Sequence, residues 1–313
     1  MKKTNRREVV KKVSGFALGA SFIPLWANQQ ADFSQKTRVL GKTGEKVSIL
    51  GLGGYHIGVS SLSDEVAIEI IRTAIDRGVN FMDNAWFYHG GRSEILMGRA
   101  LKDGYREKVF LMTKVQARTV EEAKIQMEAS LNRFQLDRVD LMQFHAIGKF
   151  EGDVDAIYNS GLIEWAEEQR SQGVFKYIGF TGHTDPSLHM DMIKRGYPWD
   201  TVQMPLNLGD YHRTVSFQHD VLSLAREKNM GVIAMKTNGA GQIGKLGIAK
   251  PTEALRYAMS SPISTAVSGI DSLKILEENL AVFEKFKPLS EQEKMAMVNR
   301  SEGQSDEIEP YRS

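Results

Sequence analysis

The sequence contains no cysteine among its 313 residues. Without cysteine the chain cannot form disulfides, thiolate metal sites, cysteine-ligated iron–sulfur clusters or a cysteine nucleophile. Its 40 basic and 39 acidic residues leave a formal net charge of +1, so the composition gives no reason to expect nucleic acid or a charged membrane surface as a partner. With 42% hydrophobic residues, the chain is able to bury one large core.

The chain also lacks a good membrane span at its N-terminus. The apolar run at residues 13–27 is too short and too rich in glycine for a span of about 20 residues, and six lysines and arginines precede it. This pattern fits a secretory signal, and residues 5–11, which include Arg6 and Arg7, resemble the twin-arginine export motif. We therefore expect residues 1–31 to be an export signal with a short linker. The candidate cleavage site follows Ala27, the twin-arginine machinery is an expected partner, and the expected location is the periplasm.

Two alternatives remain for this N-terminal segment. It could be an amphipathic helix with a basic end, or an uncleaved segment that tethers the protein to the inner membrane.

From residue 48 onward, apolar strands alternate with amphipathic helices. Eight strands are predicted, each followed by a helix: residues 48–55, a strand that begins at Phe81, then residues 109–114, 139–145, 177–181, 201–207, 231–236 and 264–270. This alternation predicts a parallel α/β sheet. Eight units without a mid-chain linker favour closure into a (β/α)8 TIM barrel over an open doubly wound sheet. With an N-terminal β-hairpin at 38–47 and an extra C-terminal helix at 290–303, residues 32–313 form one predicted domain.

Ionisable residues follow three consecutive strands of this predicted barrel. Asp83 and Tyr88 follow the strand that begins at Phe81, Lys114 ends the next strand, and His145 ends the one after. The C-terminal ends of barrel strands open onto one face, so these four side chains are expected in one pocket. Each of them alone has an ordinary structural explanation, but together they indicate a functional site.

The four groups suit proton transfer. A tyrosine titrates near pH 10 on its own, but a lysine ammonium about 4 Å away attracts a phenolate by roughly 4 kcal/mol, or up to ~3 pKa units before desolvation is subtracted. Asp83 would keep Lys114 charged, and a neutral His145 would orient a carbonyl by donating a hydrogen bond. The set is suited to protonating an oxygen next to a hydride donor.

The same residues resemble motifs of the aldo-keto reductase family. Residues 83–88, Asp-Asn-Ala-Trp-Phe-Tyr, are similar to the family's Asp-x-Ala-x-x-Tyr signature, and Thr113-Lys114 and residues 140–145 are similar to its lysine and histidine strands. The hairpin at 40–44 with the glycines of 50–53, and residues 268–271 with 277–279, are similar to the opening and closing segments of the family. The resemblance covers residues 38–286.

The resemblance implies a role for each matching position. Tyr88 would be the proton donor, Lys114 and Asp83 would set its pKa, and His145 would orient the substrate. The implied cofactor contacts are Gly53, Gly54 and Tyr55 beside the nicotinamide half, Thr181 and Gln203 at the carboxamide, and Ser268, Gly269, Lys274, Glu278 and Asn279 at the adenosine half. The N-terminus of the last barrel helix would favour phosphate. The implied substrate wall consists of Trp86, Phe87 and Asn207, and no metal is implied.

Three positions depart from the family pattern. Thr181-Gly182 replaces a Ser-Asn pair, and Met235-Lys236 stands where the family has a stacking aromatic. Ile275 occupies the place that often holds an arginine for a 2′-phosphate, although Lys274 is beside it and Lys245 and Lys250 lie in the preceding loop. NADP(H) is therefore expected over NAD(H).

The resulting hypothesis is an NAD(P)-dependent oxidoreductase that acts on an aldehyde, a ketone or a sugar-like carbonyl. A nucleotide-binding or sensing barrel with little turnover is the alternative. A metal-dependent barrel hydrolase would need a His-x-His on an early strand, and the first strand has none. The sequence makes no prediction of the substrate's identity, the reaction direction or the oligomeric state.

Overall fold

The computed structural model of the chain describes residues 35–312. The predicted export signal, with Arg6, Arg7 and Ala27, lies outside the described residues.

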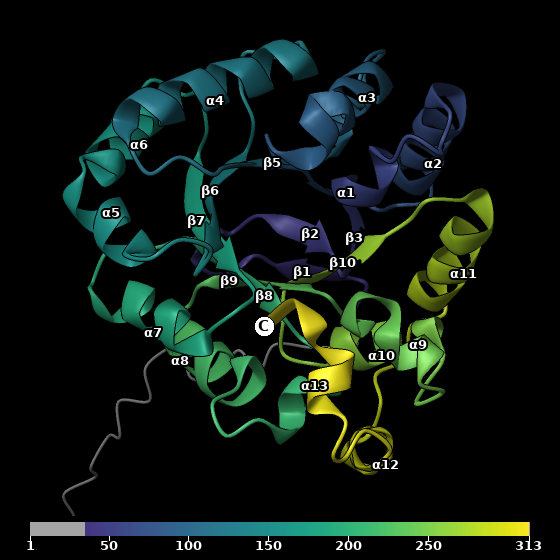
Figure 1. The fold of residues 1–313 in the computed structure, drawn as a ribbon. Helices are drawn as coiled ribbons and strands as arrows, with labels where there is room; N and C mark the ends of the chain where they lie inside the picture. The colour runs from purple at the N-terminus through teal and green to yellow at the C-terminus, as the bar shows by residue number, and fades with distance from the viewer. Residues whose placement is uncertain (1–34, 313) are drawn as a thin grey trace, which may run out of the picture. The chain divides into compact units, whose positions relative to one another are not determined.

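Eight parallel strands close into a barrel, which confirms the predicted fold (Figure 1). Their order around the ring follows the chain, and the last strand pairs with the first. The strands are β3 (Leu50–Gly53), β4 (Phe81–Asp83), β5 (Phe110–Val115), β6 (Leu141–Ile147), β7 (Tyr177–Gly182), β8 (Thr201–Pro205), β9 (Gly231–Met235) and β10 (Thr265–Gly269).

Helices surround the barrel on the outside, as Figure 1 shows. They are α1 (Gly54–Ile57), α2 (Asp64–Asp76), α3 (Arg92–Ala100), α4 (Val120–Phe134), α5 (Asp153–Asn159), α6 (Leu162–Ser171), α7 (Pro186–Lys194), α8 (Leu222–Glu227), α9 (Gln242–Lys245), α10 (Pro251–Met259) and α11 (Leu273–Glu284). Local sequence sets their ends: Ser63 accepts a hydrogen bond from the Val66 amide at the start of α2, and Thr119 caps α4 in the same way.

A two-stranded antiparallel hairpin precedes the barrel. It consists of β1 (Thr37–Val39) and β2 (Lys46–Ser48). Its buried Leu40 and Val47 belong to one apolar cluster with Phe81, Phe110 and Leu141, which stand at the starts of barrel strands. The end of the barrel at which the strands begin is therefore filled with side chains rather than open.

Successive residues of each barrel strand alternate between the lumen and the helices. On β5, Phe110 and Met112 join the cluster inside the barrel, whereas Leu111 and Val115 join the core beneath the helices. Thr113 also points outward, because its hydroxyl donates to the buried Glu94 carboxylate on α3. By this period of two, Lys114 points into the lumen.

The end of the chain contains two short elements more than the sequence predicted, a helix and a final 3₁₀ turn at Pro310–Arg312. The expected extra helix is α12 (Glu291–Asn299), and a short helix α13 (Ser305–Ile308) follows it. After α13 the chain returns over the strand ends, and Figure 1 shows the C-terminus near the middle of the ring. The fully buried Ile308 packs against Gly209, where a Cβ atom would lie 2.8 Å from its side chain.

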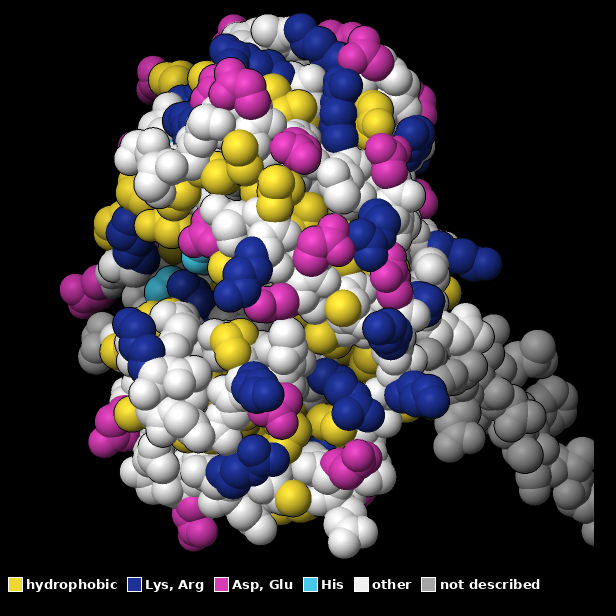
Figure 2. All heavy atoms as spheres, turned by 90° about the vertical axis from the view of Figure 1, so that its right-hand side faces the viewer, with side chains coloured by type: hydrophobic (Ala, Val, Ile, Leu, Met, Phe, Trp, Pro, Cys, Tyr) yellow, Lys and Arg dark blue, Asp and Glu magenta, His cyan; other side chains and the backbone are white. Residues whose placement is uncertain are grey.

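The outer surface carries both signs of charge. Acidic and basic side chains are interspersed over the face that bears α2 and α11 (Figure 2), in keeping with the near-zero net charge. Within residues 35–312, no helix is long and apolar enough to cross a membrane.

The N-terminal hairpin closes one end of the barrel, and Gly41 packs there against the backbone at the start of β9. Gly41 has a φ of +53°, and a Cβ atom there would lie 2.2 Å from the Gly231 amide nitrogen. We expect Gly41→Ala to lower the free energy of unfolding by about 3 kcal/mol, because the substitution adds a backbone clash to left-handed strain. Gly44→Ala is the matched control: Gly44 has a φ of +75° but open space around it, so a loss of about 1 kcal/mol is expected. If urea unfolding shows the same loss of free energy of unfolding for both variants, close packing of Gly41 against the barrel does not stabilise the protein.

Candidate functional site

A cavity of about 470 Å³ opens at the C-terminal ends of the strands. Its floor consists of inward-facing residues near the C-terminal ends of all eight strands: Gly53, Asp83, Lys114, His145, Thr181, Gln203, Met235 and Gly269. Residues beyond the strands form the wall, among them Tyr55, Phe87, Tyr88, His183 and Tyr311. The three predicted strand ends therefore do meet in one pocket.

Lys114 links the predicted acid–base residues. Its ammonium donates hydrogen bonds to the Asp83 carboxylate, to the Asn84 carbonyl oxygen at 2.7 Å and to the Tyr88 hydroxyl at 3.2 Å. These partners use all three donors of the ammonium. Lys114 is only 1% exposed and Asp83 only 4%, so the ion pair operates in a medium of low dielectric constant, where it is strong.

Lys114 keeps its positive charge although it is buried. Burial alone would lower it, but the Asp83 carboxylate and the Tyr88 hydroxyl raise the pKa of Lys114 above its ordinary value. Lys114 is therefore an ammonium throughout the neutral range. It presents a fixed positive charge to the oxygen of Tyr88.

Tyr88 differs from the expectation that Lys114 would favour its phenolate. Burial raises the pKa of Tyr88, and the attraction of Lys114 only partly opposes this effect. The physical reason is that the charge of Lys114 is already shared with Asp83, so less attraction is left to offset the loss of water. A tyrosine with a raised pKa keeps its proton, as a proton donor must.

His145 is a neutral imidazole in this setting. Burial and the nearby Lys114 place the pKa of His145 well below its ordinary value. Its ring lies edge-on to Tyr88 with 5.8 Å between the ring centroids. The Nδ1 atom is buried and has no hydrogen-bond partner within residues 35–312.

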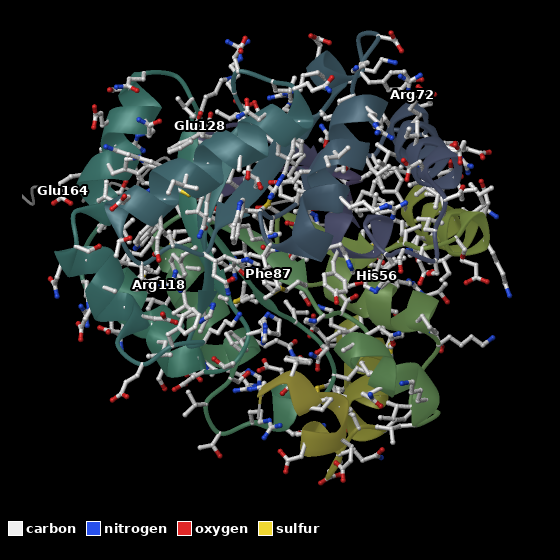
Figure 3. All side chains as sticks on the ribbon, turned by 45° about the horizontal axis from the view of Figure 1, so that its top comes forward. His56, Arg72, Phe87, Arg118, Glu128 and Glu164 are labelled. Atoms are coloured by element: carbon white, nitrogen blue, oxygen red, sulfur yellow. The ribbon has the colours of Figure 1, made fainter. Side chains whose placement is uncertain are left out.

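Arg118 holds the segment that carries His145. Its guanidinium donates to the His145 backbone oxygen at 2.9 Å and pairs with Asp153 at 2.7 Å. In the view of Figure 3, Phe87 lies between Arg118 and His56 at the barrel mouth.

The predicted nicotinamide contacts lie partly in the cavity. Gly53, Tyr55, Thr181 and Gln203 line it. Gly54 does not, and a Cβ atom there would lie 2.6 Å from the Asp83 carbonyl oxygen, so glycine is required at that position by close packing. The side chain of Gln203 hydrogen-bonds to Asp83, and its Oε1 atom is buried without a partner within the described range. An unpaired amide oxygen in the floor fits a ligand that carries an N–H group, such as a carboxamide.

The predicted adenosine contacts lie mostly outside this cavity. Gly269 lines it, but Ser268 faces away and its hydroxyl accepts a hydrogen bond from Asn279 at 2.9 Å. Lys274 and Glu278 are exposed on α11. The structure thus brings α11 next to β10 but leaves these side chains beyond the pocket.

The three residues predicted to form the substrate wall lie in different surroundings. Phe87 lines the cavity with 53% of its surface exposed. Trp86 does not line it and lies near the guanidinium of Arg133. Asn207 is fully buried and hydrogen-bonds to the Tyr311 hydroxyl, so Tyr311, rather than Asn207, faces the cavity.

Sequence reasoning missed several wall residues. They are His56, Lys149, His183, Lys236 and Tyr311. His183 and Lys236 directly follow β7 and β9, and their position after a strand was a usable signal. Tyr311 lies in the last turn of the chain, and no local pattern connects it with the barrel mouth.

The family model for the aldo/keto reductase family matches residues 49–246. This chain belongs to the aldo/keto reductase family. As a member of that family it is an oxidoreductase, and the matched segment contains all four residues of the acid–base set.

Similar proteins agree with this assignment. The chain is 28% identical over 305 residues to an L-galactose dehydrogenase of Arabidopsis thaliana, covering 83% of this chain and 92% of that protein. Among solved structures, the holo form of an aldo-keto reductase from Bacillus halodurans has a TM-score of 0.73 at 22% identity, covering 86% of this chain and 99% of the other. An aldo/keto reductase from Klebsiella pneumoniae, solved with NADP and acetate, has a TM-score of 0.67 at 21% identity, with 85% and 95% covered. At these identities the two solved structures support the fold alone.

Breaking the buried ion pair should be costly. We expect Lys114→Met to lower the free energy of unfolding by about 3 kcal/mol, because it leaves the Asp83 carboxylate buried without its counter-charge. The double variant Asp83→Asn/Lys114→Met removes both charges and should recover most of that loss. Urea unfolding of the wild type, the single variant and the double variant at pH 7 measures both effects. If the double variant is no more stable than Lys114→Met, the pair does not carry this cost.

Proposed function

We propose that the protein is an NADP(H)-dependent oxidoreductase that interconverts a carbonyl and an alcohol, with Tyr88 as the proton donor. One observation carries the proposal: the Lys114 ammonium contacts both the Asp83 carboxylate and the Tyr88 hydroxyl, beside a neutral His145, in one cavity. Membership of an oxidoreductase family agrees with this chemistry.

Each side chain has its own role in the proposed reaction. The substrate carbonyl oxygen accepts hydrogen bonds from the Tyr88 hydroxyl and from His145, which polarises and orients it. A nicotinamide dinucleotide, when bound, would supply the hydride. Tyr88 then gives its proton to the developing alkoxide, and the Lys114 ammonium stabilises the phenolate that is left. In the oxidation direction the same groups act in reverse, and Tyr88 takes the proton from the alcohol.

The cofactor proposal rests on residues of this chain. The unpaired Gln203 Oε1 would accept a hydrogen bond from the carboxamide, and Gly53 and Gly269 line the cavity without side chains. The N-terminal turn of α11, capped by Ser272, would favour phosphate. Lys274 in that turn is exposed and is the cation that would favour NADP(H) over NAD(H). Titration with NADPH and NADH tests the preference, and tighter binding of NADH would overturn it.

The substrate class follows from the cavity and from one relative. A wall with Phe87 and Tyr55 above a polar floor suits a small molecule with an apolar side and a reactive carbonyl. The similarity to an L-galactose dehydrogenase favours sugar-like substrates among these. A barrel that only senses nucleotides would bind NADPH but show no steady turnover with aldehydes, ketones or sugars.

Export by the twin-arginine route to the periplasm is a proposal that rests on residues 1–31 of the sequence alone. Such export would deliver a folded protein, so the cofactor could be bound before transit. The mass of the mature chain tests it: a product that begins at Asn28 supports export, and an intact N-terminus in the cytoplasm contradicts it.

Replacing Tyr88 should remove turnover and spare the cofactor. We expect Tyr88→Phe to lower kcat for carbonyl reduction by at least about 10²-fold, the usual contribution of a positioned acid, while the Kd for NADPH changes less than threefold. Tyr55→Phe is the matched control, because Tyr55 lines the same cavity with its ring 5.4 Å from that of Tyr88 but forms no hydrogen bond to a lysine within residues 35–312. Steady-state kinetics and fluorescence titration measure the two quantities. If Tyr88→Phe retains most of the activity, Tyr88 is not the donor.

The pH profile of reduction should be broad. Tyr88 donates while protonated, and its raised pKa keeps it so until the pH exceeds 10. His145 acts while neutral, and its lowered pKa keeps it neutral well below pH 6.5. We therefore expect kcat/KM to be flat between about pH 6 and pH 9 and to fall only at higher pH. A transition with a midpoint near pH 7 in this range would contradict the assigned protonation states.

A further inference from the structure

The last turn of the chain forms part of the cavity wall. Tyr311 lines the cavity, although it follows the final barrel strand by some forty residues and lies beyond the segment matched by the family model, which ends at residue 246. Figure 1 shows the C-terminal segment reaching the middle of the strand ring. Its position within the pocket is therefore not assigned by the family resemblance.

Tyr311 presents its ring, and not its hydroxyl, to the cavity. The hydroxyl accepts a hydrogen bond from Asn207 Nδ2 at 2.7 Å and donates to Glu309 Oε1 at 2.8 Å. Asn207 and Glu309 are 0% and 2% exposed, and neither lines the cavity. The phenol oxygen is thus occupied on the side away from the ligand space, and the ring is the part of Tyr311 that lines the cavity.

A cluster of charged side chains holds this ring in place. The Arg312 guanidinium bridges Asp210 and Glu309, at 3.0 Å to each, and Arg213 pairs with Glu309 at 3.2 Å. The two carboxylates are almost fully buried, so removing a partner would leave an uncompensated charge.

The backbone of this last turn is also tied down. The Tyr311 carbonyl oxygen lies 3.2 Å from His183 Nδ1, and Arg312 donates to the Thr184 carbonyl oxygen at 3.2 Å. These contacts, together with the charge cluster, make the last turn a fixed wall rather than a mobile lid.

Tyr311 stands opposite the proton donor. Its contacts are with segments that follow β7, β8 and β9, through His183, Asn207 and Lys236. Tyr88 follows β4, and in the ring of eight strands β4 lies four places from β8. A ligand in the cavity therefore lies between the two tyrosines. Since the substrate carbonyl must contact Tyr88 and receive a hydride from the other side, the hydride-donating ring belongs on the Tyr311 side.

Two further groups on the Tyr311 side, the Gln203 amide oxygen and the Lys236 ammonium, would suit other parts of a nicotinamide nucleotide. Thr181 and Gln203 are register partners on β7 and β8, and Gln203 Oε1 has no partner within residues 35–312. The Lys236 ammonium lies 5.4 Å from the Tyr311 ring centroid, and no carboxylate in the described part of the chain forms an ion pair with it. A flat ring, an amide acceptor and a cation without a counter-ion fit an aromatic carboxamide joined to a phosphate.

We propose that Tyr311 is a cofactor-contacting residue whose ring packs against the nicotinamide, with Lys236 near the adjoining phosphate. The inference rests on the proposed function and adds to it: the C-terminal turn completes the nicotinamide half of the site. The charge cluster of Asp210, Arg213, Glu309 and Arg312 positions this ring and does not itself contact the ligand.

The test compares two variants with two ligands. Tyr311→Leu removes the aromatic ring, whereas Tyr311→Phe keeps it and leaves Glu309 with both of its arginine partners. Calorimetry measures Kd for NADPH and for adenosine 2′,5′-bisphosphate, which lacks the nicotinamide half. Thermal unfolding of each variant checks that it is folded.

We expect Tyr311→Leu to weaken NADPH binding about tenfold, as the loss of one aromatic stacking contact would, while adenosine 2′,5′-bisphosphate binds within twofold of the wild type. Tyr311→Phe should bind both ligands within about threefold of the wild type. The inference is overturned if Tyr311→Leu leaves the Kd for NADPH unchanged, if it weakens both ligands equally, or if Tyr311→Phe is as impaired as Tyr311→Leu. A wild-type protein that binds neither ligand would instead reject the proposed function, so the two failures are distinguishable.

Discussion

The site depends on the constraint that only alternate residues of a barrel strand face the lumen. Each strand is three to seven residues long, so each offers one inward position near its C-terminal end. On β5 that position is Lys114, between the outward-facing Thr113 and Val115. A shift of one residue would exchange Lys114 for Thr113 and turn the ammonium into the helix layer. The chemistry of the pocket is therefore tied to strand register, which the apolar residues below it maintain.

The buried ion pair connects that register to the chemistry proposed for the site. Placing Lys114 and Asp83 in the barrel removes them from water, and their mutual hydrogen bonding offsets that cost only because the geometry is close. The same ammonium reaches the Tyr88 hydroxyl, so in the proposed reaction the group that pairs with Asp83 would also stabilise the Tyr88 phenolate. Because Asp83 shares the charge of Lys114 and burial raises the pKa of Tyr88, Tyr88 stays protonated in the resting site, as the proposed reduction would require.

The two ends of the described chain close opposite ends of the barrel. The N-terminal hairpin seals the lower end with Leu40 and Val47. The C-terminal turn covers part of the upper end with Tyr311. The first closure is apolar and completes the core. The second consists largely of hydrogen bonds and buried charges, and it builds a wall with specific chemistry while the rest of the mouth stays open to ligands.

Much of the site was predictable from the sequence because it depends on local pattern. Alternating strands and helices implied the barrel, and the barrel topology placed Asp83, Tyr88, Lys114 and His145 on one face. Tyr311 could not be predicted in this way. Its neighbours Asn207 and His183 lie more than a hundred residues earlier, and only the folded chain brings them together.

The direction of the pKa shift of Tyr88 also depends on the tertiary structure. The sequence determined which charges would stand near the phenol. The depth of burial and the sharing of Lys114 with Asp83 decided which effect prevails. Periodicity along the chain is set by short-range backbone geometry, and so it can be read from the residues. Desolvation and contacts between distant segments arise from packing in three dimensions, and only the tertiary structure decides them.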